Sequence, residues 1–147
     1  MKSLCAFAAV LALASYATAA AAEESTSQII RQHAPAGITE TFYRCIDKAD
    51  TDAVASAACL TAEQARQDKR LNANYQALLA KLTPEQKKQL VLAERAWLKF
   101  KETNGTFENA IWGDEIMSNL ELTQNEVFSI GARADALERY LDIVGDK

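Results

Sequence analysis

The residues from Thr61 to Ile111 constrain the fold most, because they have the pattern of two helices joined by a tight turn. In the second half, apolar and aromatic residues recur at alternating spacings of three and four, which places them on one stripe of a helix. This stripe comprises Leu90, Ala93, Trp97, Phe100, Asn104, Phe107 and Ile111. The first half repeats the spacing at Leu71, Tyr75, Leu78 and Leu82. The pattern predicts an antiparallel helical hairpin with Trp97 pointing into the helix pair.

Capping signals divide the rest of the chain into further helices. Thr83 can cap the second half of the hairpin, with Pro84 at its first position and Gln86 completing a capping box. A similar capping box begins at Thr61, where the first half of the hairpin either starts or continues from Cys59. Another begins at Thr123, where a last helix is expected after a loop over residues 116–122. No segment alternates convincingly with period two. The prediction is an all-α protein, a small bundle built on the long hairpin.

Residues 1–22 have the features of a secretory signal peptide. Lys2 provides a positive start, and residues 4–14 form an apolar run too short to span a bilayer. Small residues follow, and cleavage is expected near Ala19 or Ala22. We therefore expect a periplasmic or secreted protein with no membrane insertion after signal removal.

The mature chain is expected to be acidic and to form one domain. About 125 residues remain, enough for one core, with a flexible lead over 23–38 and a single helical domain over 39–147. Fifteen Lys and Arg against twenty Asp and Glu give a net charge of −5. This sign argues against nucleic acid and anionic membrane as partners and suits a cationic protein.

Cys45 and Cys59 remain after signal removal and are predicted to form a disulfide, as is usual for an even pair in an exported chain. Thr39 or Thr41 can start a short helix that carries Cys45. A turn with capping residues, Asp50-Thr51-Asp52, leads to a second short helix over 53–60. The bridge would join these two N-terminal helices. A redox or metal pair is disfavoured, because the spacing is not Cys-x-x-Cys and no histidine lies nearby.

The sequence lacks the residues that most catalytic or cofactor sites need. His33 is the only histidine and lies in the expected lead, which disfavours a Ser-His-Asp, Cys-His or histidine–zinc site. No glycine-rich phosphate loop is present. Carboxylates such as Glu94 and Glu102 could perform acid–base chemistry, but solvated helix faces are their more usual role. We predict a non-enzymatic protein with no catalytic residue, metal or cofactor.

Two clusters on the two halves of the hairpin form the candidate site. One contains Asp68, Leu71, Asn72 and Tyr75, and the other contains Glu94, Arg95, Trp97 and Phe100. They are either a recognition patch or, in the interpretation we prefer, a structural set. In that set the polar groups of Asn72, Arg95 and Tyr75 form hydrogen bonds with one another, while Trp97 packs in the core. Asp114 and Glu115, beside Gly113, are candidates for contact with a partner.

In their order and separation, these residues resemble the LprI-type lysozyme-inhibitor family, small exported helical proteins of bacteria. The resemblance covers roughly residues 45–141. It rests on the two cysteines, Asp68-Lys69-Arg70-Leu71-Asn72-x-x-Tyr75, Leu90-x-x-Ala93-Glu94-Arg95-Ala96-Trp97-Leu98-x-Phe100 and Arg133-x-x-x-Leu137-x-x-x-Leu141. Members often carry a second pair of cysteines; Gly105 and Asn125 stand at about those places here.

The resemblance implies an exported binding protein that inhibits lysozyme-like muramidases, and the acidic mature chain suits a cationic lysozyme. Two alternatives remain: an immunity protein against another envelope-targeting toxin, and a structural or stress protein of the envelope. A neighbouring toxin gene would favour the first alternative. If the purified protein did not slow lysozyme, the inhibitor hypothesis would be rejected.

Overall fold

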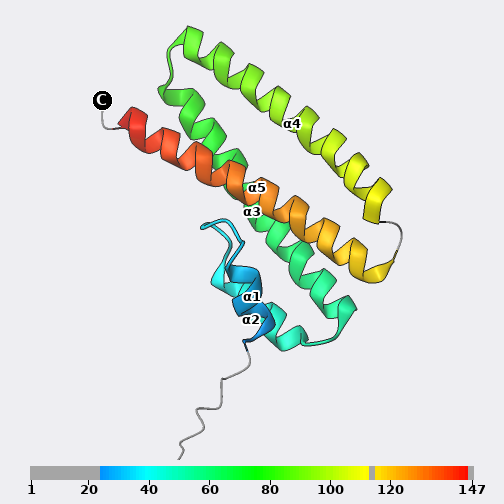
Figure 1. Ribbon diagram of the computed structural model, residues 1–147. Coiled ribbons are helices and arrows are strands. Elements are labelled where there is room, and N and C mark those ends of the chain that lie inside the picture. The colour runs from blue at the N-terminus through cyan, green and yellow to red at the C-terminus, as the bar shows by residue number, and fades with distance from the viewer. Residues whose placement is uncertain (1–23, 113–114, 146–147) are drawn as a thin grey trace, which may run out of the picture.

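The computed structural model describes residues 24–112 and 115–145, and these residues form five helices and no strand (Figure 1). The all-α fold class is confirmed. The helices are α1 (Thr26–Arg31), α2 (Glu40–Ala49), α3 (Ala53–Lys81), α4 (Pro84–Trp112) and α5 (Ile116–Gly145). The expected signal peptide lies outside the described residues.

Predicted capping residues start three of these helices. Thr39 accepts a hydrogen bond from the Phe42 N–H at 3.2 Å and so caps α2. Asp52 caps α3 by accepting from two backbone N–H groups at 2.9 and 3.0 Å. At α4 the Thr83 N–H donates to Gln86 Oε1 at 3.0 Å, and the Gln86 N–H donates back to Thr83 Oγ1 at 3.4 Å. These bonds satisfy backbone groups that the first turn of a helix leaves without partners.

The two other capping signals lie inside helices. At Thr61 the helix continues from Cys59, which was the second possibility, whereas the helix start predicted at Thr123 is wrong. Thr61 Oγ1 donates to the Ala57 carbonyl at 3.0 Å, and Thr123 Oγ1 donates to the Asn119 carbonyl at 2.8 Å. Such bonds to the preceding turn are the other option for a threonine on a helix. As a result, residues 53–60 are the beginning of the long α3, and the loop expected over 116–122 is helical.

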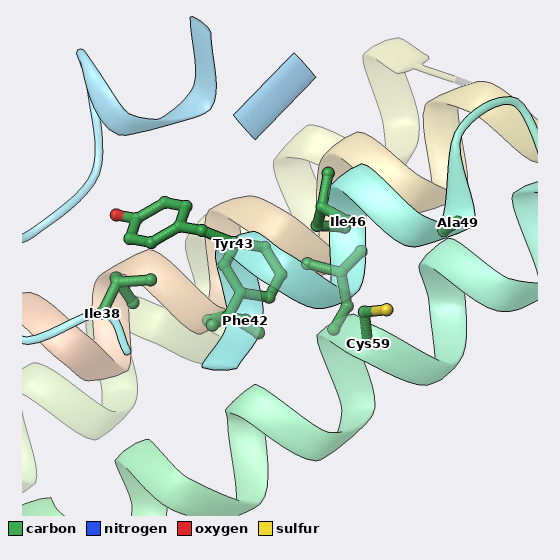
Figure 2. Packing of buried hydrophobic residues seen from close by; sticks show 8 residues of the cluster. Ile38, Phe42, Tyr43, Ile46, Ala49 and Cys59 are labelled. Atoms are coloured by element: carbon green, nitrogen blue, oxygen red, sulfur yellow. The ribbon is translucent and has the colours of Figure 1, made fainter. Parts of the chain in front are cut away.

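The disulfide between Cys45 and Cys59 is present, with a Cα–Cα distance of 5.7 Å. It joins α2 to the early turns of α3, and around it lies an N-terminal core. Figure 2 shows Phe42 and Ile46 of α2 and Cys59 of α3, which all belong to this core. The side chain of Phe42 is fully buried. Burying a side chain of this size stabilises the fold by roughly 1.5–3 kcal/mol.

The segment before α2, expected to be a flexible lead, takes part in this fold. The Ser27 hydroxyl donates to Asp47 of α2 at 2.7 Å. The Arg31 guanidinium lies 3.7 Å from the centroid of the Tyr43 ring. Ile38, just before α2, is buried in the N-terminal core. These contacts attach α1 and the following loop to α2 and α3.

The long helices pack in an order that the hairpin does not predict. α3 and α4 are joined by the expected turn, but α3 packs most extensively against α5, while α4 runs beside α5 and apart from α3 (Figure 1). The reason lies in α5, whose apolar stripe is fully buried at Val127, Ala134 and Leu137. The Asn74 amide of α3 donates to the Ala134 carbonyl at 3.1 Å, and Gly131, one turn earlier, is also small, so α5 approaches α3 closely. α5 therefore covers the apolar face of α3 that α4 was expected to cover.

Candidate functional site

The first motif cluster lies on α3, and its residues divide between the core and the surface. Leu71 is buried in a C-terminal core with Leu78 and Leu137, and Tyr75 packs against this core. Asp68 and Asn72 are exposed, and the Asn72 amide donates to the Asp68 carbonyl of its own helix at 2.9 Å. Half of this cluster therefore builds the core and half faces solvent.

The second cluster lies on α4. Glu94 is buried, Trp97 is partly buried against the C-terminal core, and Arg95 and Phe100 are exposed. The predicted mutual satisfaction of Asn72, Arg95 and Tyr75 is wrong, because Asn72 bonds to its own helix. Arg95 makes no hydrogen bond or ion pair with the described part of the chain. The cause is the helix order, since α4 packs along α5 and does not face the α3 cluster.

Glu94 attaches α4 to α5 through an ion pair with Arg133. One carboxylate oxygen of Glu94 accepts from Arg133 Nη2 at 2.7 Å and from Nε at 3.0 Å. The two side chains are only 11% and 14% exposed. Leu90, one turn earlier on the same face of α4, is buried. This pairing is not predictable, because nothing in the sequence matches a residue of one helix to its partner on another.

A cleft of about 760 Å³ lies between the C-terminal half of α4 and the N-terminal half of α5. Lys101 Nζ, in its lining, lies 2.7 Å from Glu126 Oε1 and links the two helices. Carboxylates and side-chain amides dominate the lining, and they are Glu102, Glu108, Glu126, Asn104, Asn109, Asn119 and Asn125. Leu98, Phe100 and Leu122 provide the apolar part.

The stripe of α4 that was expected in the core is largely exposed. Phe100, Phe107 and Ile111 are 60%, 60% and 62% exposed, and we call these three residues the α4 flank. Spacings of seven and four place them on one side of the helix. The face of α4 that meets α5 instead carries Glu94 and Lys101, roughly a third of a turn away. The three–four spacing of this stripe is as predicted. However, α5 occupies the surface of α3 against which the stripe was expected to pack.

Three residues named from the sequence, Glu115, Gly105 and Asn125, lie at or near this end of the molecule. Asp114 falls outside the described residues, and Glu115, just before α5, is exposed. Gly105 and Asn125, at about the places where related proteins often have cysteines, both line the cleft. The cleft therefore lies between the two positions at which the resemblance places a second pair of cysteines.

A buried carboxylate on α3, for which the sequence carries no signal, organises the junction with the N-terminal segment. Glu63 is fully buried and accepts hydrogen bonds from the Thr39 N–H at 3.0 Å and hydroxyl at 2.7 Å. Gln67 Nε2 and Arg66 Nε also donate to it, each at 2.7 Å. Burial acts to raise the pKa of Glu63, but these hydrogen bonds outweigh it and hold the pKa below its ordinary value.

A second polar junction ties the loop before α2 to both α3 and α5. Arg70 pairs with Asp135, and also with Glu138 at 2.9 Å. Asp135 accepts from the Gly37 N–H at 3.3 Å, and Gln67 donates to the Gly37 carbonyl at 2.7 Å. A Cβ at Gly37 would overlap the guanidinium of Arg70, so glycine permits this close approach. Arg70 of the family-like segment therefore has a structural role.

Within residues 24–112 and 115–145 no group of three His, Cys, Asp or Glu side chains is arranged to hold a metal ion. In the same residues no helix is long and apolar enough to cross a membrane.

The family described as "Lysozyme inhibitor LprI" matches residues 45–137. The chain belongs to the LprI family. The match begins at Cys45 of the disulfide and ends at Leu137, so it includes both motif clusters and the Glu94–Arg133 ion pair. No curated protein and no solved structure matches the chain.

Proposed function

We propose that this protein is an exported, non-enzymatic inhibitor of lysozyme-like muramidases. The observation that supports it most is the LprI family match, which spans most of the three long helices of the structure. Membership by itself gives the fold more securely than the function, so the inhibition needs its own test.

The charge of the chain supports the same proposal. Its net charge is −4, and without residues 1–22 it would be −5. An acidic protein is attracted to a basic enzyme over distances of about a Debye length, which raises the rate of encounter. Inhibition then requires only that the bound protein covers the glycan-binding cleft of the muramidase, and it requires no chemistry from the inhibitor.

A turbidity assay tests the proposal directly. Purified mature protein is added in increasing excess to a peptidoglycan suspension, and lysis by basic lysozymes of several types is followed. We expect lysis to slow in proportion to the added protein for at least one type. Unchanged lysis rates for every type at large excess would reject the proposal and leave the immunity-protein and envelope alternatives.

A further inference from the structure

We propose that the α4–α5 cleft, together with the exposed α4 flank beside it, is the surface on which the cationic muramidase docks. This inference rests on the proposed function and assigns it a place on the molecule. The cleft lies at the end of the α4–α5 pair that is farthest from the turn at Thr83.

Exposed apolar side chains are concentrated at this end. Of the twelve large apolar side chains that are exposed among the described residues, seven fall between residues 98 and 117. Phe100 belongs to both the cleft and the flank, so the two are continuous. Clustered apolar side chains rimmed by polar residues are typical of protein interaction sites, whereas scattered ones are ordinary. Phe107 and Ile111 extend this apolar surface farther along α4.

The charges around this surface select the kind of partner. The cleft lining contains three glutamates and one lysine, a net charge of −2. Lys101 is paired with Glu126, and Glu102 is paired with Lys99 at 3.0 Å. Glu108 has no hydrogen bond or ion pair with the described residues, although it is only partly exposed. A partly buried carboxylate of this kind gains most from an arriving lysine or arginine.

A second copy of the chain fits this surface less well than a basic protein does. A symmetric dimer would place the same acidic patch on both sides of the contact, and juxtaposed like charges oppose association. A basic enzyme instead brings cations to Glu108 and apolar contact area to Phe107. The neutral amides of the cleft, such as Asn104 and Asn109, can bond to a guanidinium or to backbone groups of a loop that enters.

Matched variants separate the charge and the apolar parts of this surface. Glu102→Gln combined with Glu108→Gln removes two charges from the cleft, and Phe107→Ser removes an apolar side chain from the flank. Glu85→Gln combined with Asp142→Asn removes the same charge at the opposite end of the α4–α5 pair. Val54→Ser, at an 81% exposed position on α3, is the apolar control. Inhibition of a purified basic c-type lysozyme is titrated with each variant, and urea unfolding checks that each remains folded.

We expect the cleft double variant and Phe107→Ser each to raise the half-inhibitory concentration by about tenfold or more. The two controls should change it by less than about twofold. In the wild-type protein, saturating lysozyme should slow amide hydrogen exchange over residues 98–112 and 115–126.

The outcomes distinguish this inference from the proposed function. If the wild type inhibits and the cleft and flank variants inhibit equally well, the docking surface is wrong and the function stands. Exchange protection confined to α1 and α2 would lead to the same conclusion. If the wild type neither binds nor inhibits any lysozyme, both proposals fall. A dimer that Phe107→Ser dissociates would assign the surface to a second copy.

Discussion

Arg133 of α5 directs two donors at a single oxygen of Glu94 on α4, with Nη2 at 2.7 Å and Nε at 3.0 Å. The other oxygen of Glu94, Oε1, is buried and has no hydrogen-bond partner among the described residues. This ion pair and the one between Lys101 and Glu126 link α4 to α5. α4 makes its helix contacts mainly with α5, so these links determine where α4 lies.

Removing one partner of this pair should destabilise the protein strongly. Glu94→Leu leaves the Arg133 guanidinium without a counter-ion in a site where it is 14% exposed, and Arg133→Met does the same to the Glu94 carboxylate. Each single change is expected to lower the free energy of unfolding by about 3–5 kcal/mol. Urea unfolding at neutral pH measures it.

The double variant is the control for this prediction. Glu94→Leu with Arg133→Met removes both charges and replaces them with apolar side chains, so most of the loss should be recovered. Single variants that each cost under about 1 kcal/mol would show that the pair behaves as an exposed one.

Much of the fold is predictable from the sequence because it depends on local signals. Thr39, Asp52 and Thr83 cap helices as their positions predict, and the pair Cys45–Cys59 forms the expected disulfide. Period three–four spacing also gives the correct face of α3, where Leu71 and Leu78 are buried.

Which helix faces which is not predictable in the same way. The stripe of α4 has the same spacing as the stripe of α5, yet Ala134 is buried and Phe107 is exposed. The difference arises from competition for one surface of α3, which α5 occupies because of its small residues and continuous apolar stripe. Buried polar contacts such as Glu63 with Thr39 depend on the same long-range packing. For that reason the cleft, and with it the candidate docking surface, could not be found from spacing alone.

The buried carboxylate of Glu63 should make stability depend on pH in the acid range. Its pKa in the folded protein is below the ordinary value, because hydrogen bonds from Thr39, Gln67 and Arg66 outweigh the effect of burial. Its contribution is therefore fully present above the unfolded-state pKa of about 4.3 and is lost as the pH falls through the lower folded pKa. Urea unfolding measured between pH 2 and 7, in steps of about half a pH unit, checks this pH dependence of stability.

Glu63→Gln supplies the comparison for that experiment. The amide cannot accept all of the hydrogen bonds that the carboxylate accepts, so the free energy of unfolding at pH 7 should fall by about 1–3 kcal/mol. The loss of stability with falling pH, which we call the acid limb, should also become less steep. Asp68→Asn, at an exposed position on the same helix, should leave both unchanged. An acid limb with the same slope in Glu63→Gln and wild type would contradict the assignment.

The disulfide should contribute substantially to stability in a chain of this size. Cys45→Ala or Cys59→Ala is expected to lower the free energy of unfolding by about 2–5 kcal/mol, because the open chain gains conformational freedom when it unfolds. The bridge attaches α2 to α3, so α2 and α1 should exchange amide hydrogens faster in these variants than α5 does. Thiol titration of denatured wild type should find neither Cys45 nor Cys59 free, and two free thiols would rule the bridge out.

Trp97 and Phe100 lie three residues apart on α4, but their truncation should change the free energy of unfolding by different amounts. Trp97 is partly buried and packs against the C-terminal core, whereas Phe100 is 60% exposed. Trp97→Ala is therefore expected to cost about 2 kcal/mol, less than the 3–5 kcal/mol typical of a fully buried large aromatic residue. Phe100→Ala should change stability by less than about 0.5 kcal/mol.

Urea unfolding and lysozyme inhibition, measured on both variants, separate packing from recognition. If Trp97→Ala leaves stability intact but abolishes inhibition, its indole belongs to the docking surface and not to the core.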